Sequence, residues 1–235
     1  MFTITLTCRG TGANAALGDG PAQSVFQGAL DIRIQRQNSL WCLWHTEPYR
    51  TLSLSGSPTL APEASFIEYQ IDGAITALIL VQFLLMPYPV NPFLVYAAFF
   101  SGPECIDFLL HDNQWESILK LLPNKVREEV EAVRALTKTK KLEPSNLGNE
   151  IIGQQALLLG NVDAIFFVEP RDDRQHVNFR RKVLCRILIG HSEPWAHPQF
   201  NAFAKGLRLV LCGVDHIVKA CLFPYDGIQY LRSCP

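Results

Sequence analysis

Alternation of apolar and polar residues dominates the first part of the chain. Leu30, Ile32 and Ile34 alternate with polar neighbours, which is the period of a half-buried strand. Four short segments have this β-like character, namely residues 2–8, 29–35, 40–46 and 50–55. The pattern therefore predicts a small β-rich region over residues 1–60, followed by a turn-rich linker at 55–63.

Helical spacing replaces this alternation after residue 61. Val126, Val130 and Val133 recur at the spacing of one helix face. The segments that we expect to be helical are residues 74–86, 93–100, 125–136, 149–159, 179–190 and 198–211. The first two are almost wholly apolar, so we expect them to form a buried helical hairpin. The sequence thus predicts an α+β fold, with a β-rich cap over residues 1–60 and a mostly helical body over residues 61–235.

Composition narrows the range of functions. The chain has 235 residues, enough to bury a core without disulfides. Hydrophobic residues make up 48% of it and charged residues only 18%, below the usual value of about a quarter. Either the core is large or part of the surface contacts a partner. The net charge of −1 gives no long-range attraction for phosphate backbones, so we expect no nucleic-acid partner.

Cysteine usage and apolar runs indicate the compartment. The seven cysteines are odd in number and scattered, and Met1 leads into a strand-like segment instead of a signal peptide. We therefore expect a reducing compartment, cytoplasmic or nuclear, and no secretion. The longest apolar run covers only residues 74–86, whereas a membrane-spanning helix needs about 20 residues. We expect no transmembrane segment, and insertion of residues 74–100 at a membrane interface is the less favoured alternative.

Catalytic motifs are not recognisable. Gly10 and Gly12 follow a candidate strand, as the first glycines of a dinucleotide-binding loop do. Such a loop needs a helix directly behind it, and we expect Gly20 and Pro21 to break any helix there. No G-x-S-x-G nucleophile elbow occurs in the sequence. These observations favour a protein that is not an enzyme and has no cofactor.

The C-terminal part holds three soft metal ligands close together in the sequence: Cys212, His216 and Cys221. A structural zinc site has four protein ligands, so Cys185, Cys234 or His191 would have to supply the fourth. The surrounding residues are apolar, which favours buried thiols with a capping histidine. A metal- or substrate-binding enzyme built on the C-terminal histidines and cysteines remains the alternative to a non-catalytic domain.

The stretch GHSEPWAHPQF contains the most concentrated candidate site. His191 and His197 stand on either side of Trp195, within a segment that Pro194 and Pro198 keep from forming a regular helix. The two histidines cannot share a helical face, but a bend could bring them together. We expect Trp195 to plug the start of the helix that follows, with its indole N–H on a nearby carbonyl. These three residues are the candidate binding residues.

Two short elements resemble the N-terminal lobe of HECT-type ubiquitin ligases. AFAKGL (202–207) is similar to the A-F-x-x-G-F element of that lobe, and LVLCGVD (209–215) is similar to its later L-x-L-L-x-C-G-x-x element. The elements almost touch in this chain, whereas a helix and a loop separate them in the family. The resemblance covers at most residues 65–235 and implies an N-lobe-like fold.

The same resemblance implies which chemistry the chain lacks. The catalytic cysteine of the family lies in a C-terminal lobe, within an H-T-C-F-like motif that this sequence does not contain. Cys234 has no flanking threonine. The resemblance therefore implies a truncated HECT-like piece that acts as a scaffold or protein-interaction domain, with a ubiquitin-conjugating enzyme as its partner.

Overall fold

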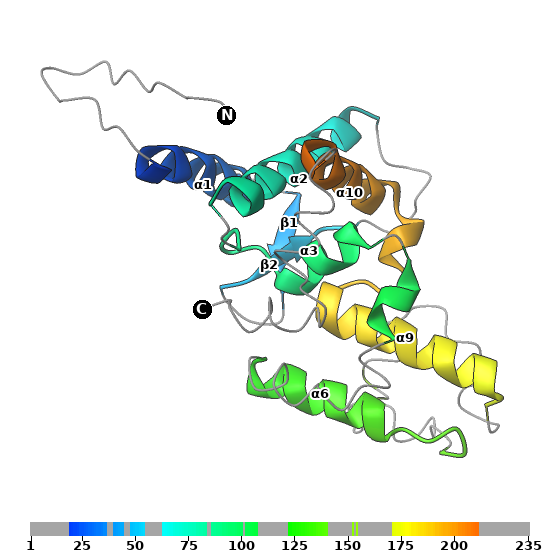
Figure 1. Cartoon of the computed structure of the whole chain (residues 1–235). Coiled ribbons are helices and arrows are strands. Elements are labelled where there is room, and N and C mark those ends of the chain that lie inside the picture. The colour runs from blue at the N-terminus through cyan, green and yellow to red at the C-terminus, as the bar shows by residue number, and fades with distance from the viewer. Residues whose placement is uncertain are drawn as a thin grey trace, which may run out of the picture.

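A computed structural model describes residues 19–36, 40–44, 48–54, 63–83, 86–100, 102–107, 122–140, 152, 154 and 171–211. In chain order its elements are α1 (Asp19–Gln35), β1 (Trp41–Leu43), β2 (Arg50–Leu52), α2 (Glu63–Phe83), α3 (Pro92–Phe99), the 3-10 turn η1 (Pro103–Ile106), α6 (Asn124–Ala135), α9 (Asp173–Ile189), the 3-10 turn η3 (Pro194–Ala196) and α10 (Pro198–Leu211). The described chain is mostly helical, with one small antiparallel sheet near its N-terminal end (Figure 1). This agrees with the coarse α+β prediction.

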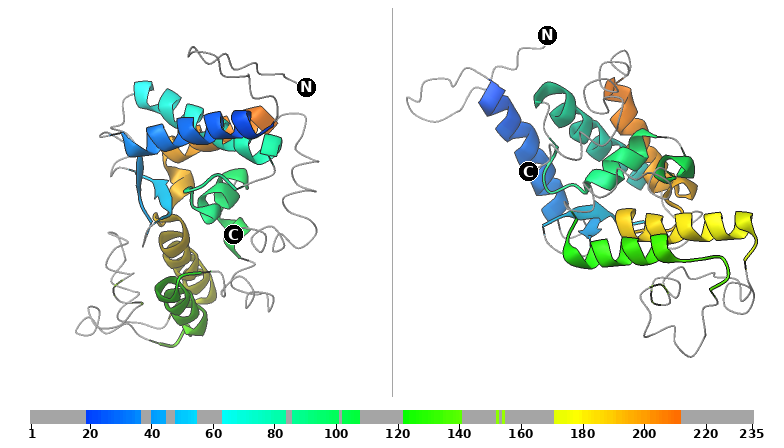
Figure 2. Two further views of the ribbon diagram at one scale, coloured as in Figure 1. Left: turned by 90° about the vertical axis from the view of Figure 1, so that its left-hand side faces the viewer. Right: turned by 60° about the horizontal axis from the view of Figure 1, so that its bottom comes forward.

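Two groups of helices surround the small sheet. In Figures 1 and 2, α1, α2 and α10 lie on one side of the β1–β2 hairpin, and α6 and α9 lie side by side on the other. α3 lies between the groups and packs against both α9 and α10. The hairpin is therefore placed where the two helix groups meet.

Residues 29–35 are helical, so the strand predicted there is wrong. Leu30 and Ile34 lie one turn apart and are 0% and 9% exposed, whereas Ile32 is 63% exposed. Leu30 and Ile34 would lie on one face of a strand and also on one face of a helix, so the sequence pattern fits both. The packing of α1 on α2 favours the helix. Pro21 lies in the first turn of α1, where its missing N–H is harmless. The expectation that Pro21 breaks a helix is therefore also wrong.

The β1–β2 hairpin confirms two of the predicted strands. The strands pair antiparallel, with Trp41 opposite Leu52 and Leu43 opposite Arg50. Trp41 and Leu52, which lie opposite each other, are both buried, so this end of the hairpin packs on the core. Three further predictions lie wholly or mostly outside the described residues: the strand at 2–8, the linker at 55–63 and the helix at 149–159.

The crossing of α2 and α10 depends on two glycines. A Cβ atom on Gly206 would overlap the carbonyl oxygen of Gln70 and lie 2.7 Å from its carbonyl carbon. A Cβ atom on Gly73 would likewise overlap the carbonyl oxygen of Phe203 and lie 2.9 Å from its carbonyl carbon. Because no Cβ approaches a non-bonded backbone atom this closely, each helix accepts only glycine at its contact point.

The two apolar segments predicted to pair as a hairpin are indeed helices, α2 and α3. They do not form a hairpin, because each packs mainly against α10: α2 along its length, and α3 at its side. The predicted buried face of α10 is confirmed, since Phe200, Phe203 and Leu207 are all 0% exposed. Within the described ranges, no helix combines the length and the apolar character needed to cross a membrane.

α6 and α9 form the second helix group. The buried face of α6 is the predicted one: Val126, Val130, Val133 and Leu136. α9 begins earlier than predicted, at Asp173, because Asp172 and Gln175 form a capping box there. It ends as predicted at Gly190, which has a positive φ of 95°. The position of this helix end determines the geometry of the site described next.

Candidate functional site

The C-terminal end of α9 is held by side chains from other elements. The last carbonyl groups of a helix have no partners within the helix and must find them elsewhere. Three buried side chains donate to successive carbonyl oxygens, in the pairs Trp44–Ile187 (2.9 Å), Asn91–Leu188 (2.7 Å) and Thr51–Ile189. We call this region the α9 junction. It fixes the hairpin and the start of α3 on the end of α9.

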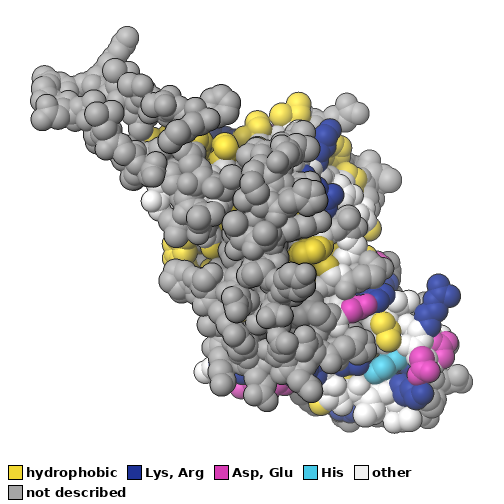
Figure 3. Space-filling model, viewed as in Figure 1, with side chains coloured by type: hydrophobic (Ala, Val, Ile, Leu, Met, Phe, Trp, Pro, Cys, Tyr) yellow, Lys and Arg dark blue, Asp and Glu magenta, His cyan; other side chains and the backbone are white. Residues whose placement is uncertain are grey.

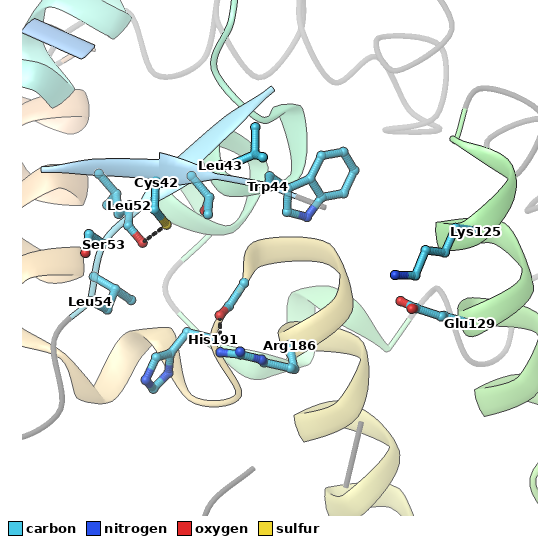
Figure 4. Close-up of a pocket in the computed structure, with 12 residues that line it drawn as sticks. Cys42, Leu43, Trp44, Leu52, Ser53, Leu54, Lys125, Glu129, Arg186 and His191 are labelled. Carbon is cyan, nitrogen blue, oxygen red and sulfur yellow. Dashed lines mark hydrogen bonds between the residues drawn. The ribbon is translucent and has the colours of Figure 1, made fainter. Parts of the chain in front are cut away.

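A cleft of about 380 Å³ opens beside the α9 junction. Its polar lining comes from the hairpin, α6 and the end of α9 (Figure 4): Cys42, Thr51, Ser53, Lys125, Glu129, Arg186 and His191. Its apolar lining comes from the hairpin: Leu43, Trp44, Leu52 and Leu54. The cleft has the size of a small-ligand site, typically about 300–1,000 Å³.

Arg186 contributes a positive charge to the cleft. Its Nη1 donates to the carbonyl oxygen of Gly190 at 2.6 Å, which closes the last turn of α9. In the part of the chain that the structure describes, Arg186 has no carboxylate partner. Lys125 and Glu129 lie one turn apart on α6 and both point toward the cleft (Figure 4). Lys125 is exposed and Glu129 is buried.

Cys42 contributes a thiol to the cleft. Its Sγ lies 3.7 Å from the carbonyl oxygen of Leu52, to which it donates weakly. Burial raises the pKa of the Cys42 thiol more than Arg186 and Arg50 lower it. The thiolate is the reactive form, so a thiol with a raised pKa is a poor nucleophile at pH 7. Cys42 thus contributes a neutral, soft wall to the cleft.

His191 and His197 meet around the bend at η3. Their ring centroids are 4.0 Å apart with an interplanar angle of 70°, so the bend does bring the two histidines together. His191 Nδ1 accepts from the backbone N–H of Glu193 at 3.2 Å. His197 is 4% exposed, and its Nδ1 has no hydrogen-bond partner among the described residues. We call these two residues the histidine pair.

Both members of the histidine pair are neutral at pH 7. Burial, together with the neighbouring His197 ring and the charge of Arg186, lowers the pKa of His191 to about 4. Burial also lowers the pKa of His197, against a smaller opposing effect of Glu193. Only His191 lines the cleft. A neutral His191 whose Nδ1 accepts a hydrogen bond presents Nε2–H as a donor.

Trp195 has the structural role predicted for it. Its indole Nε1 lies 3.2 Å from the carbonyl oxygens of Ala97 and Phe100, at the end of α3. Its ring packs edge-on against Phe200 in the first turn of α10, with centroids 5.8 Å apart. The indole N–H is therefore used inside the protein. Whether Trp195 also contacts a partner stays a prediction.

The predicted metal ligands Cys212, His216 and Cys221 lie beyond residue 211, outside the described part of the chain, as does Cys234. Cys185 is buried in α9, and burial raises the pKa of its thiol well above the usual value. Within the described ranges, no three His, Cys, Asp or Glu side chains converge as metal ligands. The C-terminal metal site therefore stays a prediction.

Sequence reasoning did not identify the cleft residues Lys125, Glu129 and Arg186. They belong to α6 and α9, two helices that are far apart in the sequence but pack side by side, and the hairpin adds the rest of the cleft lining. The one local signal was Arg186 in the last turn before Gly190, which is a common position for a cation at a helix end. That position alone indicates a helix end and not a cleft.

Comparisons with protein-family models, with curated proteins and with solved structures found no match for this chain. The function therefore has to be argued from the chemistry of its own residues.

Proposed function

We propose that this chain is a non-catalytic protein-interaction domain whose contact surface lies where α1 packs on α2. The observation that carries the proposal is the exposure of Ile32, Ile67 and Ile71, which are 63%, 62% and 39% exposed. We call these three residues the isoleucine surface. Large β-branched side chains gain free energy when they leave water, about 25 cal/mol per Å² buried. A protein partner with an apolar face would provide that burial.

The three isoleucines border one helix junction. Arg33, which follows Ile32, donates to the carboxylates of Glu68 and Asp72 in α2. Glu68 and Asp72 in turn follow Ile67 and Ile71, so the ion pairs hold the two helices together beside the isoleucines. Figure 3 shows hydrophobic side chains along the upper edge of the molecule, where α2 lies. An apolar centre with charged neighbours is the usual composition of a protein interface.

The polar groups behind the isoleucine surface are used for structure. Asp72 is buried, and its second carboxylate oxygen accepts from Trp41 Nε1 at 2.8 Å. Burial raises the pKa of Asp72 more than Arg33 and Trp41 lower it. Burial lowers the pKa of Arg33, but hydrogen bonds to Asp72 and Glu68 outweigh it, so that pKa is raised overall. Arg33 therefore stays charged and bound, which suits a rigid support better than a reactive site.

The class of partner follows from the resemblance to the HECT N-terminal lobe. The AFAKGL element lies within α10, and its Gly206 is the residue that packs directly on α2. The resembling segment thus supports the helix that carries Ile67 and Ile71. A ubiquitin-conjugating enzyme is accordingly the partner that we propose for the isoleucine surface.

A binding panel tests this proposal. A broad set of ubiquitin-conjugating enzymes would be passed over the immobilised chain, and we expect at least one to bind with a Kd of about 1–100 μM, the range of weak transient complexes. Ile67→Ser should weaken that complex about tenfold, equivalent to about 1.4 kcal/mol. Leu43→Ser is the matched control, because Leu43 is also exposed but lies on β1. Absence of binding by every enzyme would remove this partner class.

The alternative is a metal- or substrate-binding enzyme that uses the C-terminal histidines and cysteines. What favours it is the contact of His191 with His197 beside the cleft. Metal analysis of the purified protein, with Cys212→Ser and His216→Ala variants as controls, tests its metal-binding form. Clearly substoichiometric zinc in the parent protein would leave this form without support.

A further inference from the structure

The side chains that line the cleft at the α9 junction carry one more positive than negative charge. Lys125 and Arg186 are cationic, and Glu129 supplies the one carboxylate among the lining residues. The lining residues Cys42 and His191 are neutral at pH 7. Lys125 and Glu129 are one turn apart on α6 and offset each other. Arg186 is left as the excess charge, so the cleft favours a ligand with one negative charge.

Arg186 is also placed to bind a flat anion. Its Nη1 is occupied by the carbonyl oxygen of Gly190, which fixes the guanidinium at the edge of the cleft. The Nε–Nη2 edge has no partner among the described residues. Two parallel N–H donors match the two oxygens of a carboxylate, which makes a short and directional contact. The geometry of the free edge favours a carboxylate over a spherical anion.

The rest of the cleft fits the apolar part of such a ligand. Leu43, Trp44, Leu52 and Leu54 form a hydrophobic wall on the hairpin side. Trp44 and Leu52 are buried and fixed by the core, and Trp44 is further held by its bond to α9. Small-ligand sites typically combine a mainly apolar wall with a few fixed polar groups. His191 and Ser53 add neutral polar groups to the lining.

We propose that this cleft binds a small monoanionic carboxylate, with Arg186 holding the carboxylate and the leucines and Trp44 of the hairpin packing on its apolar part. Two sources share this chemistry: a free organic acid and the C-terminal carboxylate of a peptide. The site lies apart from the isoleucine surface and does not depend on the protein-interaction function.

The experiment uses two acids and their amides as probes. Binding of hexanoate, hexanamide, N-acetylleucine and N-acetylleucinamide to the full chain would be followed by shifts of the backbone amide signals of Cys42, Ser53 and Gly190. Each acid should bind at least about tenfold more tightly than its amide, since the amide loses the charge-assisted contact. Tighter binding of N-acetylleucine would indicate a peptide terminus, and tighter binding of hexanoate a free acid.

Variants place the binding on Arg186. Arg186→Gln should weaken binding of the better acid at least about tenfold. Lys125→Met is a second test. Lys125 is exposed, so the substitution should leave α6 folded, and it should also weaken binding of the acid. Lys138→Met is the control, because Lys138 pairs with Asp173 at 2.9 Å and does not line the cleft. Equal binding of acids and amides, no binding of either acid, or unchanged binding by Arg186→Gln would overturn the proposal.

Discussion

The α2–α10 crossing and the α9 junction are built in opposite ways. At the crossing, Gly73 and Gly206 bring two backbones together so closely that not even a methyl group fits. At the junction, Trp44, Thr51 and Asn91 reach across to the end of α9 and leave a cleft of about 380 Å³ beside it. The first region can only be structural. The second is held just as firmly but leaves room for a ligand.

Substitution of Gly206 breaks the crossing and should have the largest effect. The Cβ of Gly206→Ala would overlap the carbonyl oxygen of Gln70, and a backbone cannot move away as a side chain can. We expect a loss of more than about 3 kcal/mol in the free energy of unfolding, beyond ordinary overpacking. Urea denaturation measures it.

Gly28→Ala is the matched control for Gly206→Ala. Gly28 also lies inside a helix, α1, but no neighbouring group lies within 4 Å of the place that a Cβ would take there. Alanine at this position should stabilise the protein by up to about 1 kcal/mol through helix propensity. Equal effects of the two substitutions would mean that the crossing is not as tight as described.

Trp195 connects the two regions, since it joins α3 to the start of α10. Trp195→Ala should lower the free energy of unfolding by about 3 kcal/mol, the lower end for large aromatics, because the side chain is only partly buried. Trp195→Phe keeps the packing on Phe200 but loses the donor to Ala97 and Phe100, and should lose about 1 kcal/mol. If Trp195→Ala has the same melting temperature as the parent protein, Trp195 does not stabilise the fold and becomes a candidate partner contact.

Asn91 tests the α9 junction. Its side chain accepts from the Phe93 N–H at 2.9 Å as the N-cap of α3, and it donates to the carbonyl of Leu188. Asn91→Ala removes both bonds in a buried site, and we expect a loss of about 2 kcal/mol. Asn201→Ala is the control, because Asn201 is exposed and its side chain donates to the carbonyl of Trp195. Chemical denaturation of both variants should give a clearly smaller loss for Asn201→Ala.

Acid should weaken the junction through the histidine pair. The pKa values of His191 and His197 are lowered in the folded protein, to about 4 for His191. The histidine pair therefore makes its full contribution to the free energy of unfolding above about pH 6.5, the pKa of histidine in the unfolded chain. That contribution falls as the pH drops from there toward 4. Glu193 and Arg186 are the charged groups that act on the pair. Unfolding measured between pH 7.5 and 5 should show this loss, and His191→Gln should reduce it; an unchanged profile would contradict the assignment.

The smallest effect is expected at an exposed ion pair. Lys138 Nζ lies 2.9 Å from Asp173 Oδ1, and both side chains are exposed. Water and salt screen such a pair, so Lys138→Ala should leave the melting temperature close to that of the parent. A large drop in thermal melting would show that surface charge contributes more to α6 and α9 than their packed valines do.

The sequence predicted the parts of the fold that depend on local periodicity. The burial of the valines of α6 and of one face of α10 follows from helical spacing. The end of α9 at Gly190 follows from the ease with which glycine adopts a positive φ. The strand predicted at residues 29–35 is wrong because Leu30 and Ile34 fit both a strand and a helix, and only packing on α2 distinguishes them.

The parts that could not be predicted depend on contacts between distant segments. Gly73 and Gly206 show their importance only when α2 and α10 cross, and nothing in either segment indicates the partner. Arg186 becomes a cleft residue only after Trp44 and Asn91 fix the hairpin and α3 on the end of α9. The sequence allowed contact between His191 and His197 but did not require it, because the prolines predict a bend without fixing the direction of the chain after it.

The most direct test of the central claim observes the isoleucine side chains themselves. With isoleucine methyl groups labelled, a bound ubiquitin-conjugating enzyme should shift or broaden the methyl signals of Ile32, Ile67 and Ile71. The buried methyl groups of Ile79 and Ile187 serve as internal controls and should stay unchanged. Perturbation confined to the three exposed isoleucines is the result that we predict. A bound partner that leaves these three signals in place and perturbs other sites would contradict the account.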